Sequence, residues 1–350
     1  MVRSAAMASS VVSKESSPGR YVAPDYPDWQ SALSDAVRDL DELCRLLRLD
    51  PSVAREGEPA AAEFPLLVPR TFLGRIGPGD PQDPLLLQVL PQAAELARSP
   101  QFRRDPLRER SACSAPGLLQ KYQGRCLMVT TGACCVQCRF CFRRHFPYET
   151  TPATTSDWLP ALEHIARDDS IHEVILSGGD PLCLEDSQLA QVIQSLEGIP
   201  HLRRLRIHTR FPVMTPQRVT KELLGILRGC RFPLIMVVHI NHPGEVDARV
   251  AEVLSRFVDT GISVLNQAVL LRGINDQPDV LAGLCEGLVD LRVMPYYLHQ
   301  LDRVAGAMHF EVPETTGVAL TKLLRTRLPG YAVPHYVREV PGGVSKEILA

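Results

Sequence analysis

The chain has 350 residues, of which 45% are hydrophobic and 22% are charged, and its formal net charge is −2. This composition is ordinary for a globular protein, and the length allows one large α/β domain or two smaller ones. A net charge so close to zero argues against nucleic acid or an anionic membrane as the main ligand.

The sequence also argues against export and membrane insertion. The first twenty residues have no apolar core of signal-peptide length, and no stretch approaches the roughly 18 consecutive apolar residues of a spanning helix. We therefore expect a cytoplasmic protein with no membrane contact, in which the ten cysteines are free thiols or metal ligands rather than disulfides.

The first third of the chain predicts a tail followed by helices. Residues 1–22 are small and polar, and we expect a flexible tail there. Residues 23–110 predict an N-terminal helical region broken by prolines. Within it, residues 29–50 carry leucine or valine at three- and four-residue steps, after Asp28 as a candidate N-cap, which predicts one amphipathic helix.

From residue 126 onward, strand-length apolar runs alternate with helical stretches, which predicts parallel βα units. Six strands suit an α/β fold with a partial (β/α)6 barrel, and we place this barrel at residues 111–310. A C-terminal segment, residues 311–350, adds one more strand near 331–341 and a glycine turn before Lys346. The six barrel strands are expected at 126–132, 172–179, 202–210, 232–240, 261–271 and 291–300, and helices between them at 186–199, 219–229, 248–261 and 278–290.

Polar residues follow several of these strands. Folds of this class place their sites at the carboxyl ends of the strands. The polar groups are Gly178 to Asp180, His208 to Arg210, His239, Asn266 with Gln267, and residues 297–302.

Three cysteines, Cys134, Cys138 and Cys141, follow the first predicted barrel strand in the spacing C-x3-C-x2-C, and Cys135 lies out of register. Three interpretations are open: free buried thiols, a zinc site with His145 as the fourth ligand, or a [4Fe–4S] cluster held by three thiolates. The last would leave one iron free to bind another molecule.

The cysteine spacing after a first strand resembles the signature of radical S-adenosylmethionine (SAM) enzymes. LSGGDPL, at 176–182, is similar to the glycine motif that ends the second strand in that superfamily. The resemblance implies that Cys134, Cys138 and Cys141 hold a [4Fe–4S] cluster. It also implies a SAM site formed by Ser177, Gly178, Gly179, Asp180, His239 and Gln267.

A narrower resemblance covers residues 116–346 and extends into the N-terminal region. CFRRHF, LSGGDPL, VVHINHP, LNQAVLLRGIND, MPYYLHQLD and VPGGVSK are similar to lysine 2,3-aminomutases. PYYLHQLDRVAGAMHF and the Arg-Glu pair in VREVPGG resemble the shorter members, which make (R)-β-lysine for elongation factor P.

The aminomutase resemblance implies a second cofactor and a substrate site. Lys346 matches the lysine that binds pyridoxal 5′-phosphate (PLP) covalently. Arg125 and Lys121 match PLP-side positions, although the family has arginine at the latter, and lysine gives a point charge instead of a bidentate fork. Substrate positions are implied at Arg143 for the α-carboxylate and at Asp302 and Glu339 for the ε-ammonium, with Glu339 in place of a family aspartate.

The resemblance therefore implies an L-lysine 2,3-aminomutase, an isomerase that uses a [4Fe–4S] cluster, SAM and PLP. It also implies a functional link to elongation factor P and its β-lysine ligase. Two alternatives stay open at this point. One is a radical SAM and PLP aminomutase for another amino acid, and the other is a zinc- or cluster-binding protein without catalytic activity.

Overall fold

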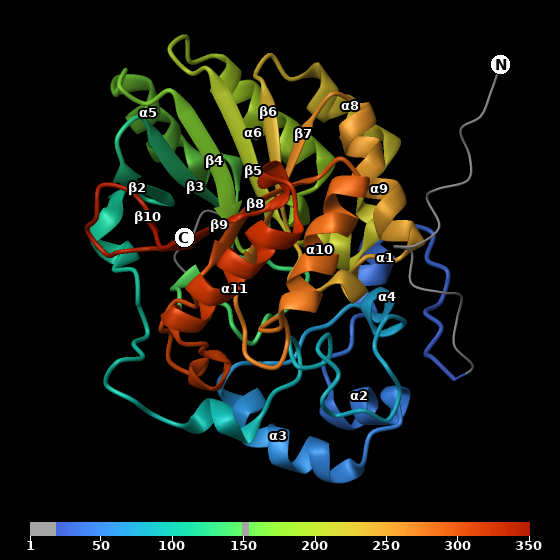
Figure 1. The fold of residues 1–350 in the computed structure, drawn as a ribbon. Helices are drawn as coiled ribbons and strands as arrows, with labels where there is room; N and C mark the ends of the chain where they lie inside the picture. Colours follow the sequence, from blue (N-terminus) through green and yellow to red (C-terminus); the bar gives the residue numbers. More distant parts are fainter. Residues whose placement is uncertain (1–18, 149–153) are drawn as a thin grey trace, which may run out of the picture.

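The computed structural model describes residues 19–148 and 154–350 (Figure 1). Of the tail expected at residues 1–22, residues 1–18 lie outside this description. Within the described residues all ten cysteines are unpaired. None of the helices described there combines the length and the apolar character needed to cross a bilayer.

Within the described residues, ten strands form one sheet in which each strand pairs with the next along the chain. Strands β3 to β9 are parallel to one another, and β1, β2 and β10 pair antiparallel at the two edges. The strands are β1 (Cys113–Ala115), β2 (Leu118–Tyr122), β3 (Arg125–Thr131), β4 (Glu173–Gly178), β5 (Arg204–Thr209), β6 (Leu234–His239), β7 (Ser263–Val269), β8 (Met294–His299), β9 (His335–Arg338) and β10 (Glu347–Ile348).

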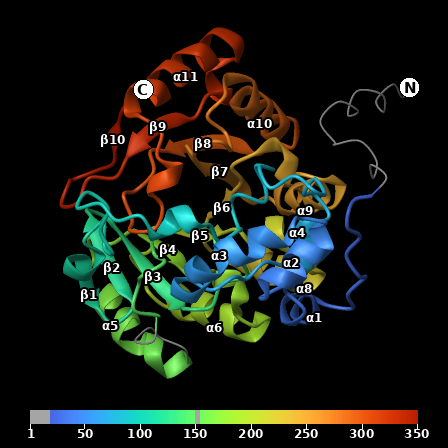
Figure 2. The same cartoon turned by 90° about the horizontal axis from the view of Figure 1, so that it is seen from below.

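Helices cover the outer face of this curved sheet, as the view from below shows (Figure 2). The helices are α5 (Leu159–Arg167), α6 (Asp186–Glu197), α7 (Phe211–Met214), α8 (Lys221–Gly229), α9 (Ala248–Asp259), α10 (Pro278–Asp290) and α11 (Glu314–Arg327). The short 3-10 helices are η1 (Ala93–Leu96), η2 (Glu109–Ala112), η4 (Thr155–Trp158), η5 (Pro181–Cys183), η6 (Pro216–Arg218), η7 (Pro243–Glu245), η8 (Met308–Phe310) and η9 (Gly330–Ala332). The predicted partial barrel is confirmed.

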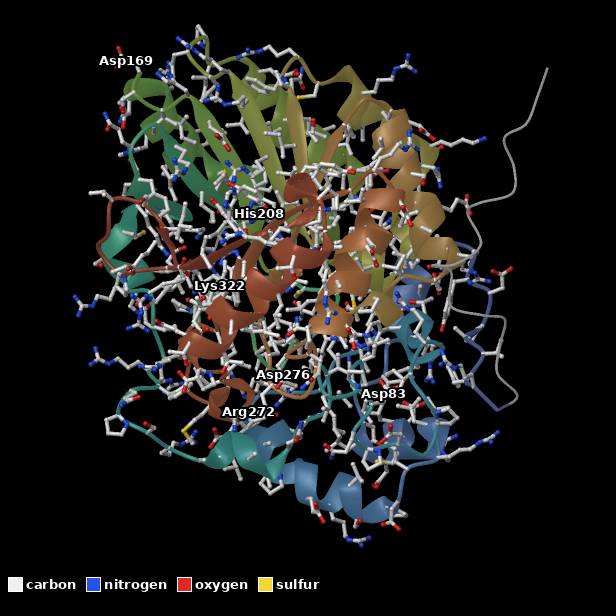
Figure 3. All side chains as sticks on the ribbon, viewed as in Figure 1. Asp83, Asp169, His208, Arg272, Asp276 and Lys322 are labelled. Carbon is white, nitrogen blue, oxygen red and sulfur yellow. The ribbon has the colours of Figure 1, made fainter. Side chains whose placement is uncertain are left out.

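The two faces of β5 illustrate how the sequence forms this barrel. Leu205 and Ile207 are fully buried, and successive side chains of a strand point to opposite faces. Arg206 and His208 therefore face the interior, and Figure 3 shows His208 in the middle of the molecule among the strands. All six strands predicted for the barrel are present, as are the four helices predicted between them.

The N-terminal region lies across the carboxyl ends of the barrel strands (Figures 1 and 2). Its backbone reaches the loop after β3, since Gln137 N–H donates to the Leu67 carbonyl oxygen and Arg139 N–H to that of Gln88, both at 2.9 Å. Its helices are α1 (Trp29–Ser34), α2 (Leu40–Leu47), α3 (Pro51–Glu63) and α4 (Arg70–Leu73).

The single helix predicted at residues 29–50 is wrong, because the chain breaks between α1 and α2. Asp28 does cap α1, as expected, but Asp39 caps a second helix by accepting a hydrogen bond from the Glu42 N–H at 2.7 Å. Val37, between the helices, forms a β-bridge with Val68, and this distant partner is invisible to a local hydrophobic pattern.

The break between α1 and α2 predicts whether a substitution at Asp39 stabilises or destabilises the protein. Asp39→Ala removes the N-cap of α2 and should cost about 1 kcal/mol of unfolding free energy, measured by chemical denaturation. In one continuous helix the same change would be stabilising, because alanine is the better helix former. Asp41, the second residue of α2, is exposed, and Asp41→Ala is the matched control. It should change the free energy of unfolding less.

Candidate active site

The cysteine loop, residues 132–148, follows the carboxyl end of β3. Cys134, Cys138 and Cys141 are half-buried, whereas Cys135 is fully buried in the core. Burial raises the pKa of the Cys141 thiol to about 12, and the nearby sulfurs of Cys138 and Cys134 add to that rise. The three thiols therefore lie close enough to influence one another, as ligands of one cluster would.

The zinc alternative required His145 beside these thiols. Instead, His145 Nε2 donates to the Ala305 carbonyl oxygen at 3.0 Å. In residues 19–148 and 154–350, no three His, Cys, Asp or Glu side chains are close enough to hold one metal ion. Ligands of a four-iron cluster bind separate irons and lie farther apart than ligands of a single ion. The donor set fits the cluster better than mononuclear zinc.

Gly178 and Gly179 bring the end of β4 directly against the cysteine loop. Gly178 has a φ of +125°, and a Cβ there would lie 2.6 Å from the Thr131 carbonyl oxygen. A Cβ on Gly179 would overlap the carbonyl oxygen of Ala133. The Gly179 N–H also donates to the Thr131 carbonyl oxygen at 2.9 Å. Only glycine permits this backbone and this approach, so the pair fixes where the cysteine loop begins.

The Asp180 carboxylate is hydrogen-bonded to donors of the protein itself. It accepts hydrogen bonds from Thr209 Oγ1 at 2.7 Å and from the backbone N–H groups of Leu182, Arg210 and Phe211 at 3.0, 2.8 and 3.1 Å. The side chain was expected at the SAM site, but its contacts tie the loop after β4 to the loop after β5.

His239 and Gln267 lie opposite each other at the carboxyl ends of β6 and β7. The His239 ring centroid is 5.6 Å from that of Phe140, which belongs to the cysteine loop. Burial, together with the nearby Arg210 guanidinium, lowers the pKa of His239 to about 4, so this imidazole is neutral at pH 7. Both residues expected at the SAM site thus face the side of the barrel where the cysteines lie.

A chain of five alternating charges crosses the interior, and we call it the charge chain. Arg143 Nε and Nη2 donate to the Glu109 carboxylate at 2.7 and 2.9 Å. Lys121 Nζ lies 3.1 Å from a Glu109 oxygen and 3.2 Å from a Glu339 oxygen. Lys346 Nζ pairs with the other Glu339 oxygen. Glu109 therefore links Arg143 to Lys121, Glu339 and Lys346, and these four residues had been expected separately at cofactor and substrate sites.

The carboxylates of the charge chain stay ionised although they are buried. Burial alone would raise the pKa of Glu339, but Lys346 and Lys121 lower it to about 2. Burial likewise opposes ionisation of Glu109, and Arg143 and Lys121 keep its pKa below its usual value. Sequence reasoning missed Glu109, because a single glutamate in the arginine-rich RERS of residues 108–111 carries no local signal of its partners.

Asp302 lies beside the charge chain but has no ion pair among the described residues. Burial and the charge of Glu339 raise its pKa to about 7, against the opposing effect of Lys346. A cavity of about 390 Å³ is lined by Asp302, Glu339, Gln300 and Arg338, among others. The lining also includes the carboxylates of Asp105 and Glu314 and the guanidinium groups of Arg103, Arg108 and Arg303, so a cationic group entering this cavity would meet charges of both signs.

Arg143 connects the two parts of the site. It follows Cys141 by two residues, and its Nη1 donates to Ser177 Oγ, at the end of β4, at 3.2 Å. A guanidinium has five N–H groups, and Glu109 and Ser177 take three of them. Two N–H groups are left without an acceptor among the described residues, and these can bind a further carboxylate.

Aromatic and imidazole groups surround Lys346. Its Nζ lies 6.0 Å from the centroid of the Tyr122 ring, and the Arg125 guanidinium lies 4.6 Å from the same centroid. His208 is kept neutral, because burial and the charges of Arg206 and Lys346 lower its pKa well below the usual value. Tyr122 had not been assigned to the site from sequence, and His208 had been noted only as a polar residue at the end of a strand.

The comparisons with known proteins agree with this geometry. The Radical SAM superfamily model matches residues 128–284, which include the three cysteines and the glycine pair. L-lysine 2,3-aminomutase of Haemophilus influenzae is 41% identical over 333 residues, covering 95% of this chain and 98% of that protein. L-lysine 2,3-aminomutase of Escherichia coli is 43% identical over 327 residues, covering 93% and 95%.

Among solved structures, Streptococcus suis SuiB bound to S-adenosylmethionine aligns with a TM-score of 0.47 and 14% identity, over 63% of this chain and 51% of that chain. The fold assignment therefore rests on the sheet described above and on the family match.

The glycine pair gives a test of the cysteine loop. Gly179→Ala should displace Ala133 and lower the iron and sulfide bound after anaerobic reconstitution by at least about half, with a lower melting temperature. Gly225→Ala is the matched control, because a Cβ there meets nothing within 4 Å in helix α8. Full iron loading of Gly179→Ala would contradict the role given to this turn.

Proposed function

Because this chain belongs to the lysine 2,3-aminomutase family of radical SAM enzymes, we propose that it converts L-lysine into (R)-β-lysine. As a family member it is an aminomutase, an isomerase whose cofactors are a [4Fe–4S] cluster, SAM and PLP. The observation that carries the lysine proposal is that Asp302 lies near Glu339 on one cavity, and that Glu339 pairs with Lys346. Two carboxylates there suit a substrate with a cationic side chain.

The residues fit these cofactors in two places. Cys134, Cys138 and Cys141 would hold the cluster, and three thiolates leave one iron open to SAM. Lys346 would hold PLP, with Tyr122 and Arg125 beside it. When bound, the cofactors supply the hydrogen abstraction and the transfer of the amino group, and the protein supplies binding and orientation.

The substrate would be held by its charges at both ends. The two open N–H groups of Arg143 bind the α-carboxylate, while Glu109 keeps the guanidinium in place from its other side. Asp302 and Glu339 bind the ε-ammonium. Charge-assisted hydrogen bonds at both ends fix the carbon atoms between them, which is the positioning that the reaction needs.

We further propose that the product serves the modification of elongation factor P through a β-lysine ligase. The motif PYYLHQLDRVAGAMHF and the near-complete overlap with two relatives of similar length support this role. Ten unpaired cysteines are in keeping with a reducing cytoplasm as the location.

The direct test is anaerobic. Protein reconstituted with iron, sulfide and PLP receives SAM, a one-electron reductant and L-lysine, and chiral chromatography resolves the products. We expect (R)-β-lysine from the native chain and none from Cys138→Ala or Lys346→Ala, with SAM cleavage retained only in the Lys346 variant. SAM cleavage without β-lysine would redirect the proposal to another amino acid, and bound zinc with neither activity would overturn it.

The pKa of Asp302 predicts a pH dependence. Below about pH 7 this carboxyl is protonated in the substrate-free protein, and a neutral acid cannot pair with an ammonium. The kcat/KM for lysine should therefore rise with pH through about 7 and then level off. Asp302→Asn should remove this inflection and lower kcat/KM about 10- to 100-fold, the value of a charged hydrogen bond.

Glu314→Gln is the matched control for Asp302→Asn. Its carboxylate lines the same cavity but pairs with Arg338, so the inflection should persist. An unchanged pH profile in Asp302→Asn would show that another group titrates.

A further inference from the structure

Arg210, at the carboxyl end of β5, touches one of the cysteines assigned to the cluster. Its Nη1 donates to Cys138 Sγ at 2.7 Å. In the described residues no corresponding arginine bond to the sulfur of Cys134 or Cys141 occurs. One of the three cluster ligands is therefore distinguished from the other two by a charged donor.

The rest of the guanidinium is buried, and a carboxylate neutralises its charge. Arg210 is 5% exposed, and its Nη2 donates to Gln88 Oε1 at 2.6 Å and to Glu245 Oε2 at 2.9 Å. Gln88 and Glu245 are fully buried. Glu245 balances the arginine charge, so the guanidinium can stay charged next to a sulfur without facing water.

The orientation of Arg210 is fixed from two more sides. Its backbone N–H donates to the Asp180 carboxylate at 2.8 Å, and its guanidinium lies 5.5 Å from the centroid of the Phe140 ring. Its Nε is buried and has no acceptor among the described residues. A buried donor of this kind costs free energy unless a ligand accepts from it.

We propose that Arg210 is a positioning residue of the cluster, which tunes its reduction through the bond to Cys138. A hydrogen bond to a ligand sulfur withdraws electron density and favours the reduced, more negative cluster. The oxidised cluster takes one electron from an external low-potential reductant, and the bond makes that step easier. This inference rests on the cluster part of the proposed function only.

Glu245 should act in the opposite direction. Its carboxylate brings a negative charge to the same guanidinium, which weakens the stabilisation of the reduced cluster. Gln88 comes from the N-terminal region and Glu245 from the loop after β6. Both accept hydrogen bonds from Arg210, and so both affect how strongly the guanidinium acts on Cys138.

The test is an anaerobic redox titration of the reconstituted protein, followed by the EPR signal of the reduced cluster, without SAM or lysine. Arg210→Met should lower the ratio of reduced to oxidised cluster about tenfold at a fixed potential, a shift of about −59 mV for one electron. Glu245→Gln should raise that ratio. Arg210→Lys keeps the charge but loses the fork, and should fall between Arg210→Met and the native protein.

Arg218→Lys is the matched control, because this fully buried arginine donates to the carbonyl oxygens of Leu182 and Leu184 and to no cluster cysteine. Its potential should equal that of the native protein. Unchanged potentials in Arg210→Met and Glu245→Gln with full iron content would overturn the proposal. Loss of iron in Arg210→Met, Arg210→Lys and Glu245→Gln alike would also overturn it, since these residues would then be needed for cluster assembly. The titration contains no lysine, so a wrong substrate assignment would not alter it.

Discussion

Opposite charges that share a dry interior have to neutralise one another, and this constraint shapes the centre of the barrel. The charge chain takes Glu109 from η2, Lys121 from β2, Arg143 from the cysteine loop, and Glu339 and Lys346 from the C-terminal segment. Removing Glu109 would leave Arg143, and removing Glu339 would leave Lys346, without its carboxylate partner among the described residues, which is more costly than losing a surface ion pair. Four separate parts of the sequence are held together by this requirement, and they include the lysine proposed to carry PLP.

The arginines around the cysteines divide into those that anchor the loop and those that face the site. Arg139 and Arg144 both bind the buried Glu95 of the N-terminal region, at 2.7 and 2.8 Å. These contacts explain why the N-terminal region is part of the site although it holds no assigned ligand. Arg143, between them in sequence, turns the other way and joins the charge chain. The cysteine loop is thus held by the N-terminal region through Arg139 and Arg144, while its sulfurs and Arg143 stay available to ligands.

The two halves of the site meet at the end of β4. Ser177 contacts Arg143, and the next two residues are the glycines that pack on the cysteine loop. A molecule lying between the cysteines and Lys346 would therefore touch a cluster ligand loop on one side and the charge chain on the other. Such an arrangement suits chemistry in which one cofactor acts on a substrate held by another, with water kept out.

The sequence by itself determined the strands and helices of the barrel, and it singled out the three thiols proposed to hold the cluster. Both are local properties, because the alternation of buried side chains and the spacing of cysteines are written in neighbouring residues. The resemblance to aminomutases likewise picked out Lys346, Arg143 and the two cavity carboxylates one by one. Only the tertiary structure decided that the helix near Val37 breaks to reach Val68, that Asp180 is occupied by protein donors, that Glu109 joins the charge chain, and that Arg210 binds Cys138. The physical reason is that the partner of a buried charge or backbone group lies far away in sequence, and only folding brings the two together.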